Sequence, residues 1–323
     1  MSTYLASLAS FTPQRILRLA NNDPASITVA RVDRFPAAVL FADISGFTAL
    51  TERLTAQGPS GAEDLTHVLN LYFGQMIDLI GEYGGDVVKF AGDALIALWP
   101  ASDATGIVAH VERIAQCSLV MQARLHNQEV AHGLRLSMKL AIGAGEVLWE
   151  HLGGVFDRWE FLIAGQPLVQ VGIANGHASP GDIVVSAEAW CLIAQAASGS
   201  PLADGAVRLT RLARTLTIEP PAALAPRPEI APALRAFIPG AIRGRLDAGH
   251  YAESPSMPSI CQKSQIAGWR PRRTGKETRH SLDAYRFFRK VSKASSGLKV
   301  DGEESGGTVL AKTRRFNSRS ALR

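Results

Sequence analysis

The chain has 323 residues, 46% of them apolar, and a formal net charge of +5 at pH 7. This length is sufficient for a sizeable core in one or two domains, and no uninterrupted apolar run reaches the roughly 18 residues that a helical membrane span requires. The first residues also lack the basic start and long apolar stretch of a secretory signal, so we expect a cytoplasmic protein without a transmembrane segment.

Positive charge is concentrated near the C-terminus rather than spread over the chain. Residues 262–323 contain 16 Lys and Arg residues against 5 Asp and Glu residues, which leaves residues 1–261 with 18 against 24. The body is therefore mildly acidic, although the whole chain is basic. Its three cysteines, Cys117, Cys191 and Cys261, lie far apart without metal-type spacing, which indicates a reducing compartment and no disulfide framework.

The first predicted elements are a short helix and a buried strand. We expect one helix in the first 35 residues, from Pro13 to Ala20, with Thr12 as its N-cap and Pro24 beyond its end. The continuous apolar run at residues 37–42 predicts a buried strand.

A long helix and a hairpin follow. Apolar side chains recur at three- and four-residue spacing over residues 62–83, which predicts a helix with one buried stripe that ends at Gly84. Residues 86–90 and 94–99 are strand-like on either side of a Gly-Asp pair and predict a hairpin. We expect a second helix at residues 104–129.

The rest of the body continues as short strands and helices. We expect, in chain order, a strand at 134–144 that 146–150 continues, a strand at 159–164, a helix at 165–178, a strand at 183–186, a helix at 187–196 and a last hairpin at 207–218. Helices that alternate with a partly hairpin-built sheet predict an α+β fold, an α/β sandwich of the ferredoxin-like type.

Composition divides the chain into four segments. They are an N-terminal extension (1–34), the α+β body (35–220), a Pro-rich linker with one short helix at 233–250 (221–250), and a basic tail (251–323). The tail is poor in apolar residues, so we expect it to be mostly disordered. Contact of the tail with nucleic acid or an acidic membrane, and a change of reading frame near Tyr251, are alternatives to a solvated end.

Two acidic residues fifty positions apart are candidates for one cation site. Asp43 follows the apolar strand at 37–42, and Asp93 stands in the turn of the hairpin. If these strands are neighbours, both carboxylates reach one edge of the sheet, where hard oxygen ligands suit Mg²⁺ or Mn²⁺. Each acid alone has a plainer interpretation, because Asp is common as a helix cap and in turns.

The segment after Asp43 is a candidate phosphate-binding turn. Strand passes into helix through five residues, Ile44, Ser45, Gly46, Phe47 and Thr48. The free backbone N–H groups at the start of a helix attract anions. We therefore expect this turn to hold the β- and γ-phosphates of a nucleotide.

Three motifs follow one another in the body: FADISGFTALTERL, GGDVVKFAGDALIALW and LSMKLAIGAGEV. Their order and spacing resemble the catalytic domain of the class III nucleotidyl cyclases. Within that family the chain is most similar to the first catalytic domain of the bicarbonate-regulated soluble adenylyl cyclases, for which KFAGDALIALW and the later IAGQPLV are typical. The resemblance covers about residues 35–220 and implies the cyclase-type α+β fold.

The resemblance implies a metal-dependent reaction on ATP. Acids at the positions of Asp43 and Asp93 bind two Mg²⁺ or Mn²⁺ ions in that family, and the carbonyl at Ile44 helps. A basic residue at the position of Lys139 meets the terminal phosphates. The ribose 3′-hydroxyl attacks the α-phosphorus, so that cyclic AMP and pyrophosphate form. Without the resemblance, Lys139 would be interpreted as a solvated strand-edge charge.

The resemblance also implies that half of the site is absent from this sequence. In the family a second domain supplies a base-reading Lys, together with an Asn and an Arg on the helix after GQPLV, and residues 169–174 contain neither. We therefore expect a complementary cyclase domain in trans or a homodimer partner. A regulatory or pseudo-cyclase module that binds nucleotide and metal but turns over poorly is the alternative.

Lys89 matches the base-reading Lys by position. The resemblance implies that in a first domain it faces a degenerate second pocket, which is where the soluble enzymes bind bicarbonate. An Arg of the family assists there, but Gly172 stands near its place in this chain. A solvent-facing strand lysine is the alternative interpretation of Lys89.

Overall fold

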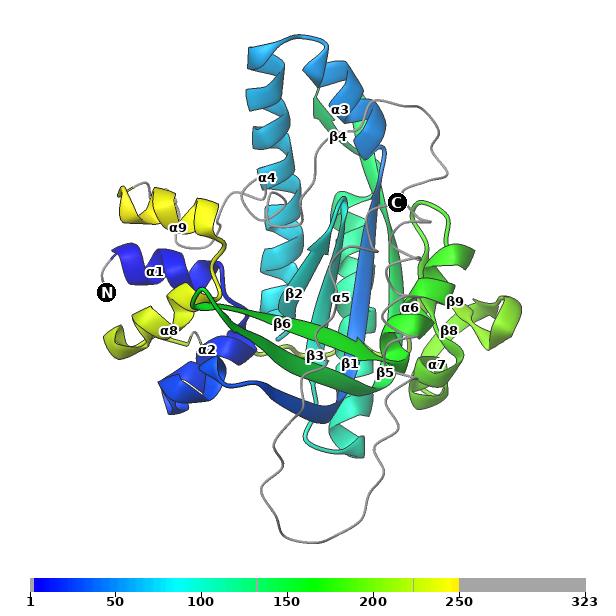
Figure 1. The fold of residues 1–323 in the computed structure, drawn as a ribbon. Coiled ribbons are helices and arrows are strands. Elements are labelled where there is room, and N and C mark those ends of the chain that lie inside the picture. Colours follow the sequence, from blue (N-terminus) through cyan, green and yellow to red (C-terminus); the bar gives the residue numbers. More distant parts are fainter. Residues whose placement is uncertain (1–2, 132, 223, 250–323) are drawn as a thin grey trace, which may run out of the picture.

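The structure is a computed structural model that describes residues 3–131, 133–222 and 224–249. Within these residues nine strands form one sheet, and helices lie on both of its faces (Figure 1). None of the helices in these residues combines the length and the apolar character that a membrane span requires. The tail that we predicted to be disordered, 251–323, lies outside the described residues.

The bounds of the elements are as follows. The strands are β1 (Arg31–Ser45), β2 (Asp86–Ala91), β3 (Ala94–Pro100), β4 (Gln128–Ala131), β5 (Leu134–Val155), β6 (Arg158–Gly165), β7 (Ile183–Val185), β8 (Ala197–Pro201) and β9 (Val207–Leu212). The α-helices are α1 (Thr3–Ser10), α2 (Gln14–Asn22), α3 (Phe47–Thr55), α4 (Pro59–Glu82), α5 (Ala104–Leu125), α6 (Gln166–His177), α7 (Ala187–Ile193), α8 (Ala231–Ala236) and α9 (Gly240–Asp247). Short 3₁₀ turns are η1 (Pro24–Thr28), η2 (Ala203–Gly205) and η3 (Pro228–Ile230).

The strand order confirms the predicted α+β, ferredoxin-like arrangement. The first half of the sheet runs β2-β3-β1-β5, and β1 is antiparallel to both of its neighbours. Helices α3 and α4 connect β1 to β2, and α5 leads from β3 toward β5, so that a strand-helix-strand unit occurs twice. Strands β7, β9 and β8 extend the sheet beyond β5.

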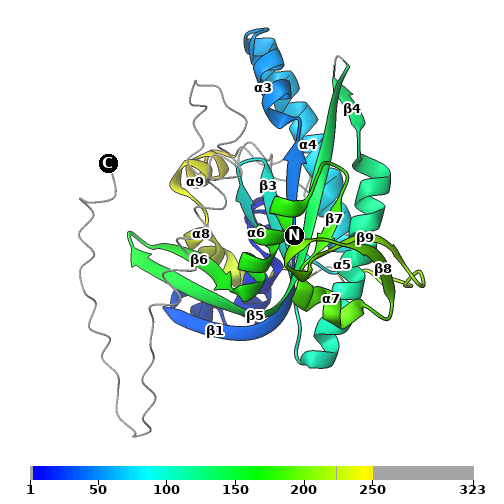
Figure 2. The same cartoon turned by 90° about the vertical axis from the view of Figure 1, so that its right-hand side faces the viewer.

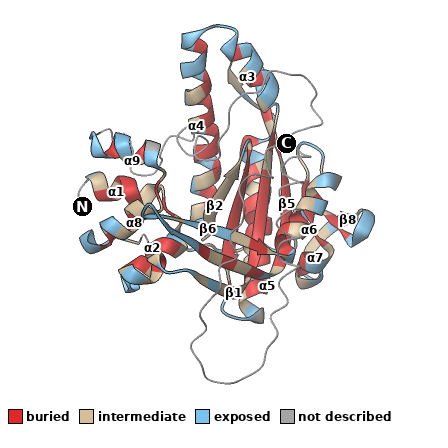
Figure 3. Cartoon of the chain, viewed as in Figure 1, coloured by how far each residue is buried: buried red, intermediate tan, exposed pale blue. Residues whose placement is uncertain are grey.

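The helices α4 and α5 pack on one face of the sheet. Figure 3 shows the buried stripe along α4 that faces the sheet. Leu40 of β1 belongs to this core, where Tyr72 of α4 and Trp99 of β3 are almost completely buried. The polar atoms of the two aromatic side chains are satisfied, because the Tyr72 hydroxyl donates to the Leu125 carbonyl oxygen at 3.0 Å and Trp99 Nε1 donates to that of Tyr83 at 2.8 Å. This core is the stripe that the spacing of residues 62–83 predicts.

The opposite face carries α6 and helices from both ends of the described chain (Figure 2). Helices α1 and α2 pack against α8, and Leu8, Ile16 and Leu234 are fully buried there. The Tyr4 hydroxyl adds a hydrogen bond of 3.2 Å to Asp247 Oδ1 of α9. The first and last described helices therefore form one helical block, visible as the blue and yellow helices of Figure 1.

The N-terminal segment is more ordered than predicted. Helix α1 was not expected, and Pro13 rather than Thr12 occupies the N-cap of α2. The first N–H groups of α2, at Gln14 and Arg15, instead donate to the carboxylate of Asp86 in β2, each at 2.9 Å. An acceptor that comes from another element takes the place of a local cap, which sequence periodicity does not reveal.

Strand β1 is longer than the predicted run 37–42. Its first residues are partly polar, but they pair with the second half of β5, where Arg31 lies opposite His151. The predicted helix 104–129 ends at Leu125, because Glu129 belongs to β4, which pairs with the start of β5.

Two predictions, one at the end of the body and one in the linker, were wrong in detail. The last hairpin is formed by β8 and β9 over 197–212 rather than 207–218. The segment 233–250 contains parts of two helices, α8 and α9, rather than one helix. Pro239 separates them, since it occupies the N-cap of α9 and has no N–H to continue α8.

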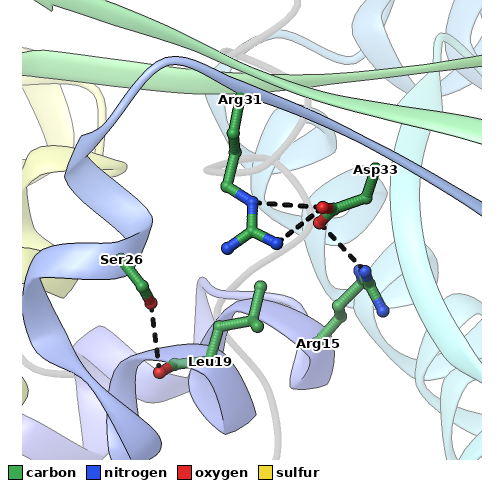
Figure 4. A network of polar contacts seen from close by, with 5 residues as sticks. All are labelled: Arg15, Leu19, Ser26, Arg31 and Asp33. Carbon is green, nitrogen blue, oxygen red and sulfur yellow. Dashed lines mark hydrogen bonds and ion pairs between the residues drawn. The ribbon is translucent and has the colours of Figure 1, made fainter. Parts of the chain in front are cut away.

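A small ion network joins the N-terminal block to β1 (Figure 4). Asp33 accepts hydrogen bonds from Arg15 Nη2 at 3.2 Å and from Arg31 Nη2 at 2.5 Å. Burial opposes the ionisation of Asp33, but the hydrogen bonds and charges of the two guanidinium groups outweigh it, so the pKa of Asp33 lies below its ordinary value. The network holds α2 against the sheet.

Stability is expected to fall as pH drops below about 6.5, and His151 is expected to contribute. Its side chain is fully buried, and burial, followed by the positive charge of Arg31, lowers its pKa below the ordinary value of 6.5. The unfolded chain then binds more protons than the folded chain in this pH range, so acidification favours unfolding. Urea midpoints measured between pH 7.5 and 5.5 should shift less in His151→Phe than in the wild type. The control His67→Gln changes an exposed histidine and should show the wild-type shift. A shift in His151→Phe equal to that of the wild type would contradict the contribution of His151.

Candidate active site

Asp43 lies near the end of β1, between β3 and β5. Its neighbours in the sheet are Ala94 on one side and Lys139 on the other. Successive side chains of a strand alternate between faces, and Leu40 belongs to the core under α4 and α5. Asp43, three residues further, therefore faces the opposite side of the sheet, where α6 packs.

Asp93 stands beside the end of β1, as the sequence predicts. Gly92 and Asp93 form the two-residue loop of the β2–β3 hairpin, and Gly92 has a positive φ of 68° that favours glycine. The carbonyl oxygen of Asp93 accepts a hydrogen bond of 3.2 Å from the backbone N–H of Ile44. The hairpin turn that carries Asp93 is thus held against Ile44, the residue that follows Asp43.

Two side chains contact the carboxylate of Asp43. Lys139 Nζ lies 3.6 Å from Asp43 Oδ2, and Asn175 Nδ2 of α6 donates to the same oxygen at 3.3 Å. The Asp43 and Lys139 side chains are only 17% and 22% exposed. Lys139 is therefore not a solvated edge charge, and Asp43 is not a simple helix cap.

The turn from Ser45 to Thr48 begins α3. Gly46 occupies the N-cap with a φ of 96°, and a Cβ at this position would lie 2.8 Å from the backbone oxygen of Arg135. Both the left-handed backbone and the close approach require glycine. The first N–H groups of α3 have no acceptor within the helix, which makes its start a candidate anion site next to Asp43.

Helix α6 is held on the sheet by a buried glutamine. Gln170 Oε1 accepts hydrogen bonds from the Ala144 N–H at 2.9 Å and from the Ser186 hydroxyl at 3.1 Å. Gly143 of β5 permits this close packing, since a Cβ there would lie 2.7 Å from the Pro167 oxygen. The anchored helix carries Asn175 over the end of β1.

The profile of the adenylate and guanylate cyclase catalytic domain family matches residues 31–199. The chain belongs to this family. The cyclase domain is 34% identical over 163 residues to adenylate cyclase type 10 of Oryctolagus cuniculus and 32% identical over 163 residues to that of Homo sapiens. Each alignment covers 50% of this chain and 10% of the relative, so the chain spans about a tenth of the length of the curated relatives that it matches.

Two solved cyclase structures superpose on part of this chain. The adenylyl cyclase CyaB from P. aeruginosa superposes with a TM-score of 0.49 at 22% sequence identity, over 58% of this chain and 100% of that chain. The guanylyl cyclase Cya2 superposes with a TM-score of 0.47 at 22% identity, over 58% of this chain and 98% of that chain.

Lys89 is not part of the group around Asp43 in this cyclase domain. It is half-buried on β2, opposite Ile96 of β3, and lines a cavity of about 440 Å³. The walls of this cavity come from β2, β6, the N-terminal helices and Phe237 at the end of α8. Lys89 is therefore not a simple solvent-facing strand lysine.

Asn175 is the site residue that sequence reasoning missed. The resemblance points to an Asn and an Arg at 169–174 of this helix, and both are absent there, but Asn175 follows one residue later. A single polar residue on a helix gives no pattern, and its partner Asp43 is 132 positions away. Only the packing of α6 on β5 and β1 reveals the contact.

Proposed function

We propose that this cyclase domain converts ATP to cyclic AMP and pyrophosphate and supplies the metal- and phosphate-binding half of a site shared with a second domain. The observation that carries the proposal is the ion pair of Lys139 with Asp43 near the end of β1, beside the turn that carries Asp93 and close to the start of α3. Two acids, one ammonium group and the partial positive charge at the start of a helix match the charges of a cation-bound triphosphate.

The donor set fits a divalent cation that arrives with its substrate. No group of three or more His, Cys, Asp or Glu side chains gathers in the part of the chain that the structure describes. Mg²⁺ is commonly bound through one or two carboxylates together with the phosphates of a nucleotide rather than by a complete protein cage. Asp43 and Asp93, with the Ile44 carbonyl, would hold two Mg²⁺ or Mn²⁺ ions, which neutralise the developing charge on the phosphates.

The remaining residues of the half-site bind and orient the triphosphate. Lys139 already lies within ion-pair distance of Asp43, and it would meet the terminal phosphates. Backbone N–H groups between Ser45 and Thr48 would donate hydrogen bonds to the β- and γ-phosphates, because the N-terminal end of α3 carries partial positive charge. These groups place the α-phosphorus for attack by the ribose 3′-hydroxyl.

A second cyclase domain would complete the site. The helix that would present an Asn and an Arg to the transition state, α6, has Val, Gln, Val, Gly, Ile and Ala at 169–174. A homodimer would contain the cation-binding half twice but would lack both the Asn and the Arg. Loss of one such electrostatic group lowers the reaction rate by a factor on the order of 10²–10³. The preferred partner is therefore a different domain that carries a base-reading Lys, an Asn and an Arg.

ATP is the proposed substrate, because the relatives at 34% and 32% identity are named adenylate cyclases. We also place the domain in the cytoplasm, in keeping with its well-separated cysteines. Regulation by bicarbonate is not part of the proposal, because Gly172 has no side chain that could bind an anion.

The same gap at 169–174 favours a second candidate function. Without a catalytic partner, the domain would bind metal and nucleotide but turn over poorly, as a regulatory or pseudo-cyclase module. A nucleic-acid or membrane function of the basic tail is a third candidate that rests on the charge of residues 262–323 alone.

One assay separates the first two functions. The purified full chain is given Mn-ATP or Mn-GTP, alone and with a protein that contains a complementary second cyclase domain, and cyclic product is measured. We expect cyclic AMP in the presence of the second domain and little or none without it. Nucleotide binding without turnover under every condition would support the module instead, and a preference for GTP would contradict the substrate assignment.

A further inference from the structure

We infer that Asn175 is a positioning residue of the cation site, which it serves by holding the Asp43 carboxylate in place when the cation is bound. This inference rests on the proposed function, because it assigns Asp43 a cation. It concerns a side chain on α6, an element that the proposal otherwise treats as lacking functional groups.

The contacts of Asp43 single out one carboxylate oxygen. Asn175 Nδ2 and Lys139 Nζ both approach Oδ2, at 3.3 and 3.6 Å. Among the described residues no side-chain hydrogen bond or ion pair engages Asp43 Oδ1. A carboxylate held through one oxygen keeps the other available as a ligand in a fixed orientation.

The two partners of Oδ2 differ in what a cation does to them. The ammonium group of Lys139 is repelled when a divalent cation binds Asp43, and the phosphates of the nucleotide attract it away. The amide of Asn175 is neutral, so it can donate to Oδ2 whether or not a cation is present. Asn175 is therefore the partner that remains on Asp43 in the loaded site.

The environment of Asn175 argues against a role in stability alone. Its Oδ1 is buried, and it has no hydrogen-bond donor among the described residues. A buried carbonyl oxygen without a donor is unfavourable, so an apolar side chain would suit the fold better at this position. The Asn175 amide oxygen is thus left without a donor, while its NH₂ group donates to the Asp43 carboxylate. Such an unfavourable arrangement is expected where a residue serves function.

Helix α6, which carries Asn175, is firmly packed on the sheet. Gln170 ties the same helix to β5 and to Ser186, and both its hydrogen bonds are buried. Val171 and Ala174 are buried against the sheet on the same side. The position of the Asn175 side chain is therefore set by the fold, independently of any ligand.

The test is to titrate the purified full chain with Mn²⁺ in the presence of a non-hydrolysable ATP analogue. Free Mn²⁺ is measured by its electron paramagnetic resonance signal. Asn175→Leu should weaken Mn²⁺ binding about 10–100-fold, which is the usual effect of removing a partner that orients a metal ligand. Its thermal unfolding midpoint should equal or exceed that of the wild type, since an unsatisfied buried oxygen is removed. Asn175→Ala provides a second variant if leucine does not fit the space.

The controls distinguish this inference from the proposed function. Ile173→Ala changes an exposed residue of the same helix and should bind Mn²⁺ like the wild type. If Asp43→Asn abolishes binding but both Asn175 variants bind normally, Asn175 has no positioning role and the proposed function stands. If Asp43→Asn binds Mn²⁺ as the wild type does, or if the wild type does not bind it, the cation assignment fails and this inference fails with it.

Discussion

Cyclic AMP formation with a complementary domain is expected to fall by at least about 100-fold when Asp93 is replaced by Asn. The substitution removes one negative charge from a site that must gather cations around a triphosphate. Asn is well tolerated in tight turns, so the Gly92-Asp93 loop and the backbone hydrogen bond to Ile44 should persist. Initial rates measured at saturating Mn-ATP, together with a thermal unfolding curve, separate lost chemistry from lost folding.

Asp157→Asn is the matched control for this substitution. Asp157 is exposed at the tip of the β5–β6 hairpin, and its φ of 54° suits Asn equally well. It removes the same charge far from the candidate site along the chain and should leave the rate unchanged. Wild-type product formation by Asp93→Asn would show that this acid does not hold a catalytic cation.

Lys139→Gln is expected to change cation and nucleotide binding in opposite directions. In the absence of nucleotide, Lys139 is an ion-pair partner of Asp43 at 3.6 Å, so its removal should strengthen Mn²⁺ binding several-fold because a competing positive charge disappears. In the presence of nucleotide, the affinity for ATP should fall about 10-fold or more, because a charge-assisted contact to phosphate is lost. Isothermal titration with Mn²⁺ alone and then with Mn-ATP measures both effects.

Arg34→Gln controls for a general effect of charge. Arg34 lies on the same strand as Asp43 but forms an exposed ion pair with Glu146 at 3.1 Å. Exposed pairs contribute little, so both affinities should remain at wild-type values. If Lys139→Gln also leaves both unchanged, Lys139 is a structural partner of Asp43 and not a phosphate ligand.

Asp43 and Asp93 could be predicted from the sequence to lie near each other, because each belongs to a pattern that a few neighbouring residues define. The apolar run before Asp43 and the strand-Gly-Asp-strand pattern around Asp93 are both complete within a few residues. The helix from 62 to 83 was predictable for the same reason, since its buried stripe repeats along one segment. A resemblance to the cyclases then supplied the expectation that the two patterns belong to one site.

The contacts that complete the site could not be predicted in this way. Asn175 meets Asp43 only because Gln170 and Gly143 seat α6 on β5, and each of these contacts joins residues far apart in the chain. The N-terminal block is similar, because the start of α2 is capped by Asp86 rather than by a neighbouring side chain. The first half of β1 was missed because its pairing with β5, not its composition, makes it a strand.

The amino-acid sequence by itself therefore determined the long helices, most of the central strands, the turn at Gly92-Asp93 and the glycine that begins α3, because hydrophobic period and turn chemistry are properties of short segments. Only the tertiary structure decided which side chains hold the Asp43 carboxylate and which face of the sheet the N-terminal helices cover. Those choices depend on packing between distant segments, where burial of apolar surface and the need to satisfy polar groups select one arrangement among many that the local patterns allow.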